Sequence, residues 1–271
     1  MIPDQPSDPP QHSLQIRGHT ATYTDEGSGP TVVAVHGLPG GDFDFRWLGA
    51  ALEPHCRFIR LNLPGFGGSA PGGCTFRWPA PAEWVAEALD QLDVKDVTLL
   101  GHSYGSSVAT AASLLRPERV HRLALLAPIG LRKHKGFRNF PIPKIAVSLL
   151  STPGIRQPVY TLFRQAFRRA GFRKPISNEQ IFRTIEAIAS WSFEDYKARV
   201  QTLHIPVFGA LSEDDHLVEA EIIRELLQQC PHGPRLAFED GGHNLQKSYA
   251  VEVATALLQW ISTNPCTSGE N

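Results

Sequence analysis

Residues 97–112 read Val-Thr-Leu-Leu-Gly-His-Ser-Tyr-Gly-Ser-Ser-Val-Ala-Thr-Ala-Ala. An apolar, strand-like run leads into Gly101, and small residues compatible with a helix follow Gly105. Between them lies a G-x-S-x-G motif, which exposes its serine when it forms a sharp strand-to-helix turn. Glycine suits both flanking positions, because a Cβ there would clash as strand and helix approach each other. The stretch therefore predicts that Ser103 is a nucleophile at the tip of such a turn.

The composition indicates a globular protein. The chain of 271 residues is 42% hydrophobic and 20% charged, which suits one core domain with or without an insertion. Its four cysteines lie far apart, so reduced thiols are expected rather than a metal site or a redox pair. The Pro-rich stretch 1–13 lacks the apolar centre of a signal peptide, and no apolar run is long enough to span a membrane. We expect a cytoplasmic protein that uses no cofactor and no metal.

Strand-like runs alternate with helix-like ones along most of the chain. The strand-like runs are 31–35, 58–63, 97–100, 123–126, 207–211 and 236–239, and the amphipathic runs are 82–92, 106–115, 220–229 and 248–260. This alternation predicts the α/β class, with a mostly parallel central sheet covered by helices on both faces. Two earlier runs, 14–17 and 21–24, predict an antiparallel lead-in.

The alternation stops after Pro128 and resumes at Val207. The stretch between them contains helix-like pieces separated by prolines, without a strand signal. We therefore predict three segments, namely a first part of the core (1–129), a mainly helical cap (130–202) and a second part of the core (203–271). The cap is basic, because residues 132–174 contain eleven Lys or Arg and no Asp or Glu.

A serine nucleophile needs a base, and the base needs an acid that orients it. His243 is the predicted base, because it follows the last strand-like run and two glycines free its loop to approach the sheet edge. Asp215 is the predicted acid, in the loop after the strand-like run 207–211. Asp214 remains an alternative, since acidic residues also suit the start of a helix.

The developing oxyanion needs backbone N–H donors. The residue after the nucleophile, Tyr104, is one predicted donor, and Leu38 in the glycine-rich segment 36–41 is the other. Among the remaining histidines, His102 is expected to face away from the nucleophile, and His134 is expected in solvent-like surroundings.

Five motifs occur in order along the chain: His36-Gly37, Leu-Pro-Gly-Phe-Gly-Gly-Ser at 63–69, Gly-His-Ser-Tyr-Gly at 101–105, Asp215, and Gly242-His243. With these motifs the chain resembles the α/β-hydrolase superfamily. The resemblance implies that family's fold with an inserted cap. It also implies a Ser103, Asp215 and His243 triad with oxyanion donors at Leu38 and Tyr104.

Three positions depart from the family pattern. Asn62 stands where an Asp is usual, and Glu219 stands where many members have Pro; both bear on loop packing. The segment 40–45 resembles a branch of the family that has no assigned activity. This weakens any inference of the substrate from other members of the family. Haloalkane dehalogenases and epoxide hydrolases attack with a carboxylate, so the serine at position 103 argues against those reactions.

These features predict a serine hydrolase that cleaves a carboxylic ester or a related acyl substrate through an acyl-enzyme. The alternatives are a cofactor-independent carbon–carbon hydrolase or lyase with the same triad, and a non-catalytic hydrolase-like binding protein. The expected partner is a small acyl molecule. The basic cap is either a solvated lid face, or it contacts anionic substrates or, weakly, an anionic lipid surface. Nucleic acid is not expected.

Overall fold

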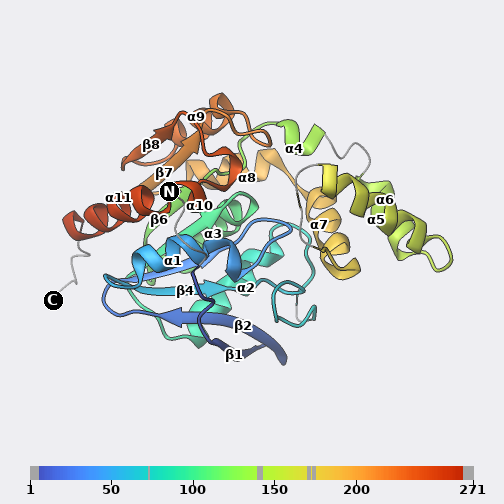
Figure 1. Cartoon of the computed structure of the whole chain (residues 1–271), viewed down its shortest axis with the longest axis horizontal. Coiled ribbons are helices and arrows are strands. Elements are labelled where there is room, and N and C mark those ends of the chain that lie inside the picture. The colour runs from blue at the N-terminus through green and yellow to red at the C-terminus, as the bar shows by residue number, and fades with distance from the viewer. Residues whose placement is uncertain (1–5, 73, 139–142, 170–171, 173–174, 265–271) are drawn as a thin grey trace.

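The computed structural model describes residues 6–72, 74–138, 143–169, 172 and 175–264. An eight-stranded sheet lies at the centre, in the order β1-β2-β4-β3-β5-β6-β7-β8 (Figure 1). Its strands are β1 (Gln11–Ile16), β2 (His19–Glu26), β3 (Thr31–Val35), β4 (Arg57–Leu61), β5 (Val97–His102), β6 (Val120–Leu126), β7 (Val207–Ser212) and β8 (Arg235–Phe238). The pairs β1–β2 and β2–β4 are antiparallel and all other neighbours are parallel. The predicted α/β class, the mostly parallel sheet and the antiparallel lead-in are confirmed.

Helices cover both faces of the sheet. They are α1 (Arg46–Leu52), α2 (Ala80–Gln91), α3 (Tyr104–Leu115), α4 (Lys135–Arg138), α5 (Pro143–Ser151), α6 (Arg156–Arg169), α7 (Asn178–Ser190), α8 (Phe193–Gln201), α9 (Ala220–Gln229), α10 (Leu245–Ser248) and α11 (Ala250–Thr263), with short 3-10 turns η1 (Asp42–Phe45) and η2 (Gly242–Asn244). One buried cluster joins the sheet to α2, α3, α8 and α9, and a second joins it to α1 and α11. Because both faces are covered, β5 is buried at every residue, as its apolar run requires.

The helix α1 lies outside the predicted elements. It has only seven residues, which is too few for a helical period to stand out from the sequence. Its Leu48 and Leu52, one turn apart, pack with Phe45 into the cluster beneath the sheet. Tertiary packing rather than local pattern therefore accounts for this helix.

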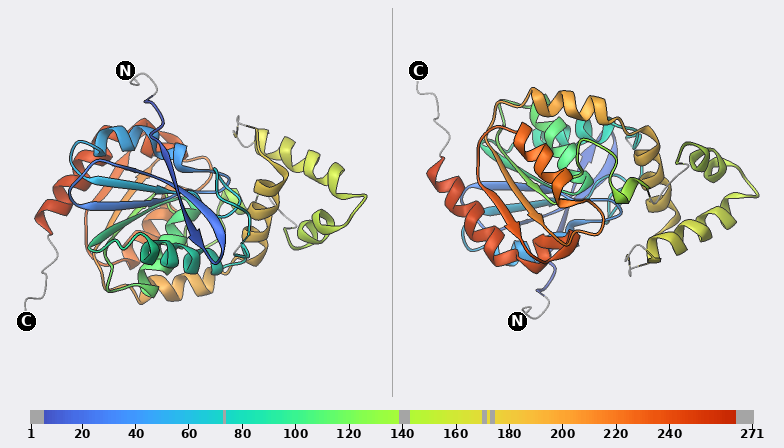
Figure 2. Two further views of the ribbon diagram at one scale, coloured as in Figure 1. Left: turned by 90° about the horizontal axis from the view of Figure 1, so that it is seen from below. Right: turned by 90° about the horizontal axis from the view of Figure 1, so that it is seen from above.

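The segment α4–α8 is a helical insert between β6 and β7, as the sequence predicts. Helices α5, α6 and α7 share a small apolar core of their own, which includes Leu150, Phe167 and Ile185. Helix α8 instead contacts α3 and α9, and its Tyr196 and Val200 belong to the core of the sheet. The segment boundaries at 130 and 202 stay predictions. Figure 2 shows α5 and α6 projecting away from the sheet in both views.

Polar contacts attach the insert to the core. The carboxylate of Glu219 accepts the Lys135 backbone N–H at 3.0 Å and pairs with Arg138, which fixes α4 to the loop after β7. The carboxylate of Glu186 on α7 accepts the backbone N–H of Phe76 at 2.9 Å. Glu219, which stands where many family members have Pro, thus takes part in loop packing.

Asn62 also serves loop packing. Its Oδ1 accepts the backbone N–H of Asp42 at 2.8 Å, and its Nδ2 donates to Oγ1 of Thr22 at 3.1 Å.

Among the residues that the structure describes, no helix has the length and apolarity needed to cross a bilayer. Within the same residues, no cluster of three His, Cys, Asp or Glu is arranged to hold a metal ion.

Candidate active site

The turn around Ser103 has the conformation that the motif requires. Ser103 lies between β5 and α3 with φ 54° and ψ −123°, a region that residues with a side chain rarely occupy. A Cβ on Gly101 would collide with the carbonyl of Gly105, and a Cβ on Gly105 would collide with the carbonyl of Val35. Both glycines are therefore needed for strand and helix to pack this closely. The side chain of Ser103 is presented at the carboxyl edge of the parallel strands, where open α/β sheets place their sites.

The structure brings Ser103, His243 and Asp215 together. Nε2 of His243 lies 2.8 Å from Oγ of Ser103, and Nδ1 of His243 lies 2.8 Å from Oδ2 of Asp215. A carboxylate can only accept, so Nδ1 carries the ring proton and donates it to Asp215. The lone pair of Nε2 is then free to accept the Ser103 hydroxyl proton. This tautomer is the one that a general base requires.

Asp215 is held as a buried carboxylate. Its side chain has no exposed surface, and its Oδ1 accepts the backbone N–H groups of Leu217 and Val218 at 2.8 and 3.0 Å. Burial alone would raise the pKa of this carboxyl. The electrostatic attraction and hydrogen bond of His243, with the two N–H groups, outweigh that effect and hold the pKa of Asp215 below the usual value. The acid therefore stays ionised although it is out of solvent.

Asp214 lies beside the same loop but contacts the backbone. Its Oδ1 accepts the Gly242 N–H at 2.8 Å and it makes no bond to the ring of His243. The geometry thus separates the two acids that the sequence left open. Asp215 contacts the imidazole, and Asp214 supports the segment that carries it.

The two predicted oxyanion donors flank Ser103. Tyr104 is the first residue of α3, so its N–H belongs to the helix end that has no intrahelical acceptor. Leu38 follows β3 and lines the cavity beside Ser103. The backbone of this loop comes very close to the serine, since a Cβ on Gly37 would lie 2.9 Å from Cβ of Ser103.

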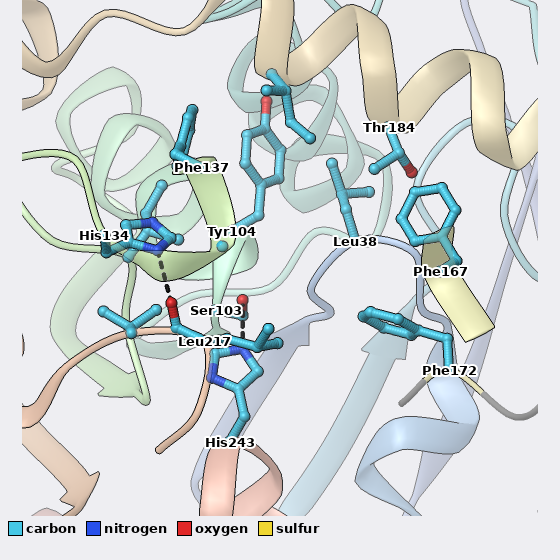
Figure 3. Close-up of a pocket in the computed structure, with 14 residues that line it drawn as sticks. Leu38, Ser103, Tyr104, His134, Phe137, Phe167, Phe172, Thr184, Leu217 and His243 are labelled. Carbon is cyan, nitrogen blue, oxygen red and sulfur yellow. Dashed lines mark hydrogen bonds between the residues drawn. The ribbon is translucent and has the colours of Figure 1, made fainter. Parts of the chain in front are cut away.

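Two pockets meet at Ser103 and His243. The first is a mainly apolar cavity between the sheet edge and the insert. Figure 3 shows Phe137, Phe167 and Phe172 around it, with Thr184 on the side of α7. The second is wider and more polar, and its lining includes Trp47, His216 and Lys247. A substrate that spans both pockets would place one bond over the serine.

His134 corrects an expectation, because it is buried rather than solvated. It is 4% exposed and lines the apolar cavity, and its Nδ1 donates to the carbonyl of Leu217 at 2.9 Å (Figure 3). Burial lowers the pKa of His134 to about 4, so the ring is neutral near pH 7. No local pattern signals this placement, since the contact joins residues 83 positions apart.

A profile of the family described as the alpha/beta hydrolase fold matches residues 30–248, from β3 to the end of α10. The chain belongs to this family. The match includes the strand-to-helix turn at Ser103 (the elbow), the loop that carries Asp215 and the loop that carries His243.

This alpha/beta hydrolase is similar to known proteins in sequence and in fold. It is 36% identical over 276 residues to the dihydrolipoyllysine-residue acetyltransferase component of an acetoin cleaving system from Pseudomonas putida. The aligned region covers 95% of this chain and 71% of the relative. It is 25% identical over 260 residues to the pimeloyl-[acyl-carrier protein] methyl ester esterase of Aliivibrio fischeri, with 89% and 96% covered. An alpha/beta hydrolase fold protein from Burkholderia ambifaria superposes with a TM-score of 0.75 at 19% identity, with 92% and 97% covered.

Proposed function

We propose that this alpha/beta hydrolase cleaves a carboxylic ester or a related acyl compound through an acyl-enzyme. The observation that carries the proposal is the continuous chain of hydrogen bonds from Ser103 through His243 to Asp215, with 2.8 Å at each step. A serine hydroxyl becomes an effective nucleophile when a base with the correct tautomer takes its proton. The esterase named above, at 25% identity, agrees with this class of reaction.

The proposed reaction has two halves. Oγ of Ser103 attacks the carbonyl carbon while Nε2 of His243 takes the hydroxyl proton, and Asp215 stabilises the resulting imidazolium. The tetrahedral intermediate collapses, the C–O bond to the leaving group breaks, and His243 returns the proton to the departing alkoxide. Water, deprotonated by His243, then attacks the acyl-enzyme and releases the acid and free Ser103.

The backbone N–H groups of Leu38 and Tyr104 are the proposed oxyanion donors. In serine hydrolases the loss of one such donor typically costs about 3–4 kcal/mol of transition-state stabilisation. The apolar cavity suits the acyl chain, because its walls are mainly aromatic and aliphatic. The wider, more polar pocket suits the leaving alcohol and the entering water.

Labelling with a fluorophosphonate probe tests the nucleophile. The wild-type protein should be labelled at Ser103, and Ser103→Ala should not react. Ser148→Ala is a matched control, since Ser148 is exposed on α5 and outside both pockets. A folded wild-type protein that fails to react would overturn the proposal in favour of a binding protein. Labelling of Ser103→Ala equal to that of the wild type would show that Ser103 is not the nucleophile.

A substrate panel then tests the reaction class. We expect turnover of p-nitrophenyl esters, with a preference set by acyl length because Phe167 and Phe172 are among the side chains that line the apolar cavity. Lactones, amides and a vinylogous diketone complete the panel. Turnover of the diketone alone, without a trapped acyl-enzyme, would replace ester hydrolysis by carbon–carbon cleavage.

A further inference from the structure

The hairpin formed by α5 and α6, residues 143–169, exposes apolar side chains. Among the described residues five large hydrophobic side chains are exposed, and three of them, Ile145, Ile155 and Leu162, belong to this hairpin. Leu162 keeps 63% of its surface exposed, the highest value of the five. The hairpin projects from the body of the protein, so these side chains do not belong to the buried core of the sheet (Figure 2).

Helix α6 has two different faces. Its inner face carries Tyr160 and Phe167, which are buried in the core of the insert, and Phe167 also lines the apolar cavity beside Ser103. Its outer face carries Pro158, Leu162 and Arg169, which recur at helical spacing and are all exposed. One helix thus separates the proposed substrate cavity from an exposed apolar surface.

The exposed face of the hairpin is positively charged. Lys144, Arg156, Arg168 and Arg169 are exposed, and within the described part of the chain none of them takes part in an ion pair. By contrast, Arg132 near the base of the insert is paired with Glu225. Residues 132–174 contain no acidic side chain, so nothing on the hairpin neutralises these four cations.

We propose that the α5–α6 hairpin docks on an anionic lipid surface, from which apolar acyl substrates reach the cavity behind α6. Ile155 and Leu162 would insert at the level of the head groups, and Arg168 and Arg169 would contact lipid phosphates. Cations favour a negatively charged surface by about 1 kcal/mol each, and the apolar side chains leave water. A second copy of the chain fits this face poorly, because the two cationic hairpins would repel each other. The substrate route rests on the proposed function, whereas the docking does not.

Vesicle sedimentation with the full-length Ser103→Ala protein tests docking separately from hydrolysis, since this variant cannot turn over. We expect binding to vesicles of phosphatidylcholine and phosphatidylglycerol, and at least tenfold weaker binding to phosphatidylcholine alone. Raising the salt from about 0.05 to about 0.5 M should weaken the binding, because the Debye length shortens. Equal binding to neutral and anionic vesicles, or binding to neither, would overturn the proposal.

Substitutions locate the surface. Arg168→Gln with Arg169→Gln should weaken binding to anionic vesicles about 30-fold, which corresponds to about 1 kcal/mol for each arginine. Leu162→Ser should weaken it several-fold. The matched controls are Lys95→Gln with Lys197→Gln, two exposed cations outside the hairpin, and Val251→Ser, an exposed apolar residue on α11. These controls should bind like the parent protein.

Two results would contradict the assignment to the hairpin. One is a loss of binding in the controls that equals the loss in the hairpin variants. The other is self-association in analytical ultracentrifugation that disappears in Leu162→Ser while vesicles are not bound, which would assign the face to a second copy. If docking is confirmed while the fluorophosphonate probe fails to react, the surface stands and the proposed hydrolysis falls.

Discussion

The ring of His102 lies next to the nucleophile in sequence and holds the backbone of His243. Nε2 of His102 is 2.8 Å from the carbonyl oxygen of His243, 141 residues away in the chain. A carbonyl only accepts, so Nε2 is the protonated nitrogen of His102. Burial, together with the nearby His243, lowers the pKa of His102 to about 3. The neutral ring thus connects the elbow to the loop that carries the proposed base.

This contact predicts a positioning role for His102. His102→Ala should lower kcat about tenfold with little change in KM, because a buried hydrogen bond of about 1–1.5 kcal/mol no longer orients the loop of His243. His102→Gln keeps an N–H donor and should recover part of the loss. Steady-state kinetics on the best ester of the panel provide the measurement. Equal kcat values for the alanine variant and the wild type would exclude this role.

The two neighbouring acids should differ sharply. Asp215→Asn should lower kcat by about 10³–10⁴-fold, because the amide can donate to Nδ1 of His243 and so stabilise the wrong tautomer. Asp214→Asn keeps a carbonyl acceptor for the Gly242 N–H and should lose less than tenfold. Circular dichroism would check that both variants fold. A larger loss in the Asp214 variant would reverse the assignment.

His134 predicts a pH dependence of stability. Its pKa is about 4 in the folded protein, against 6.5 as its ordinary value. Between these values the unfolded chain binds a proton that the folded chain excludes, so the free energy of unfolding falls as the pH falls from 6.5 to 4. The contribution is at most about 1.4 kcal/mol for each pH unit.

His134→Gln removes this titration and keeps a donor for the Leu217 carbonyl. Urea unfolding at about pH 7, just above this window, and at about pH 6 and 5 within it, should therefore show a smaller loss of stability on acidification in the variant than in the wild type. His36 and His102, which are also buried with lowered pKa values, remain in both proteins and cancel in the comparison. Parallel curves for the two proteins would show that His134 does not titrate in this range.

The elbow predicts a strong size limit at Gly105. Gly105→Ala should lose more than about 3 kcal/mol of stability, because the new Cβ would meet the carbonyl of Val35 in the centre of the sheet. Gly154→Ala is the control, with φ +89° but open space around its Cβ, and should lose about 1–2 kcal/mol. Urea midpoints compare the two variants. Similar losses at both positions would mean that the turn can relax.

The sequence by itself determined the alternation of the main strands and helices, and it singled out the side chains that we propose as reactive. Buried parallel strands are continuous apolar runs, so β3 and β5 could be located from those runs alone. Ser103 and His243 were recognisable because an elbow and a glycine-rich loop restrict which residues can occupy them. These signals are local, since they come from the conformation of a few consecutive residues.

Only the tertiary structure decided the relationships between distant segments. Asp215 and Asp214 are adjacent in the chain and chemically identical, and it is the path of the loop that aims one at the imidazole and the other at a backbone N–H. His134 is buried because the insert folds over the loop after β7. Such burial depends on contacts across more than 80 residues, which no local periodicity or spacing records.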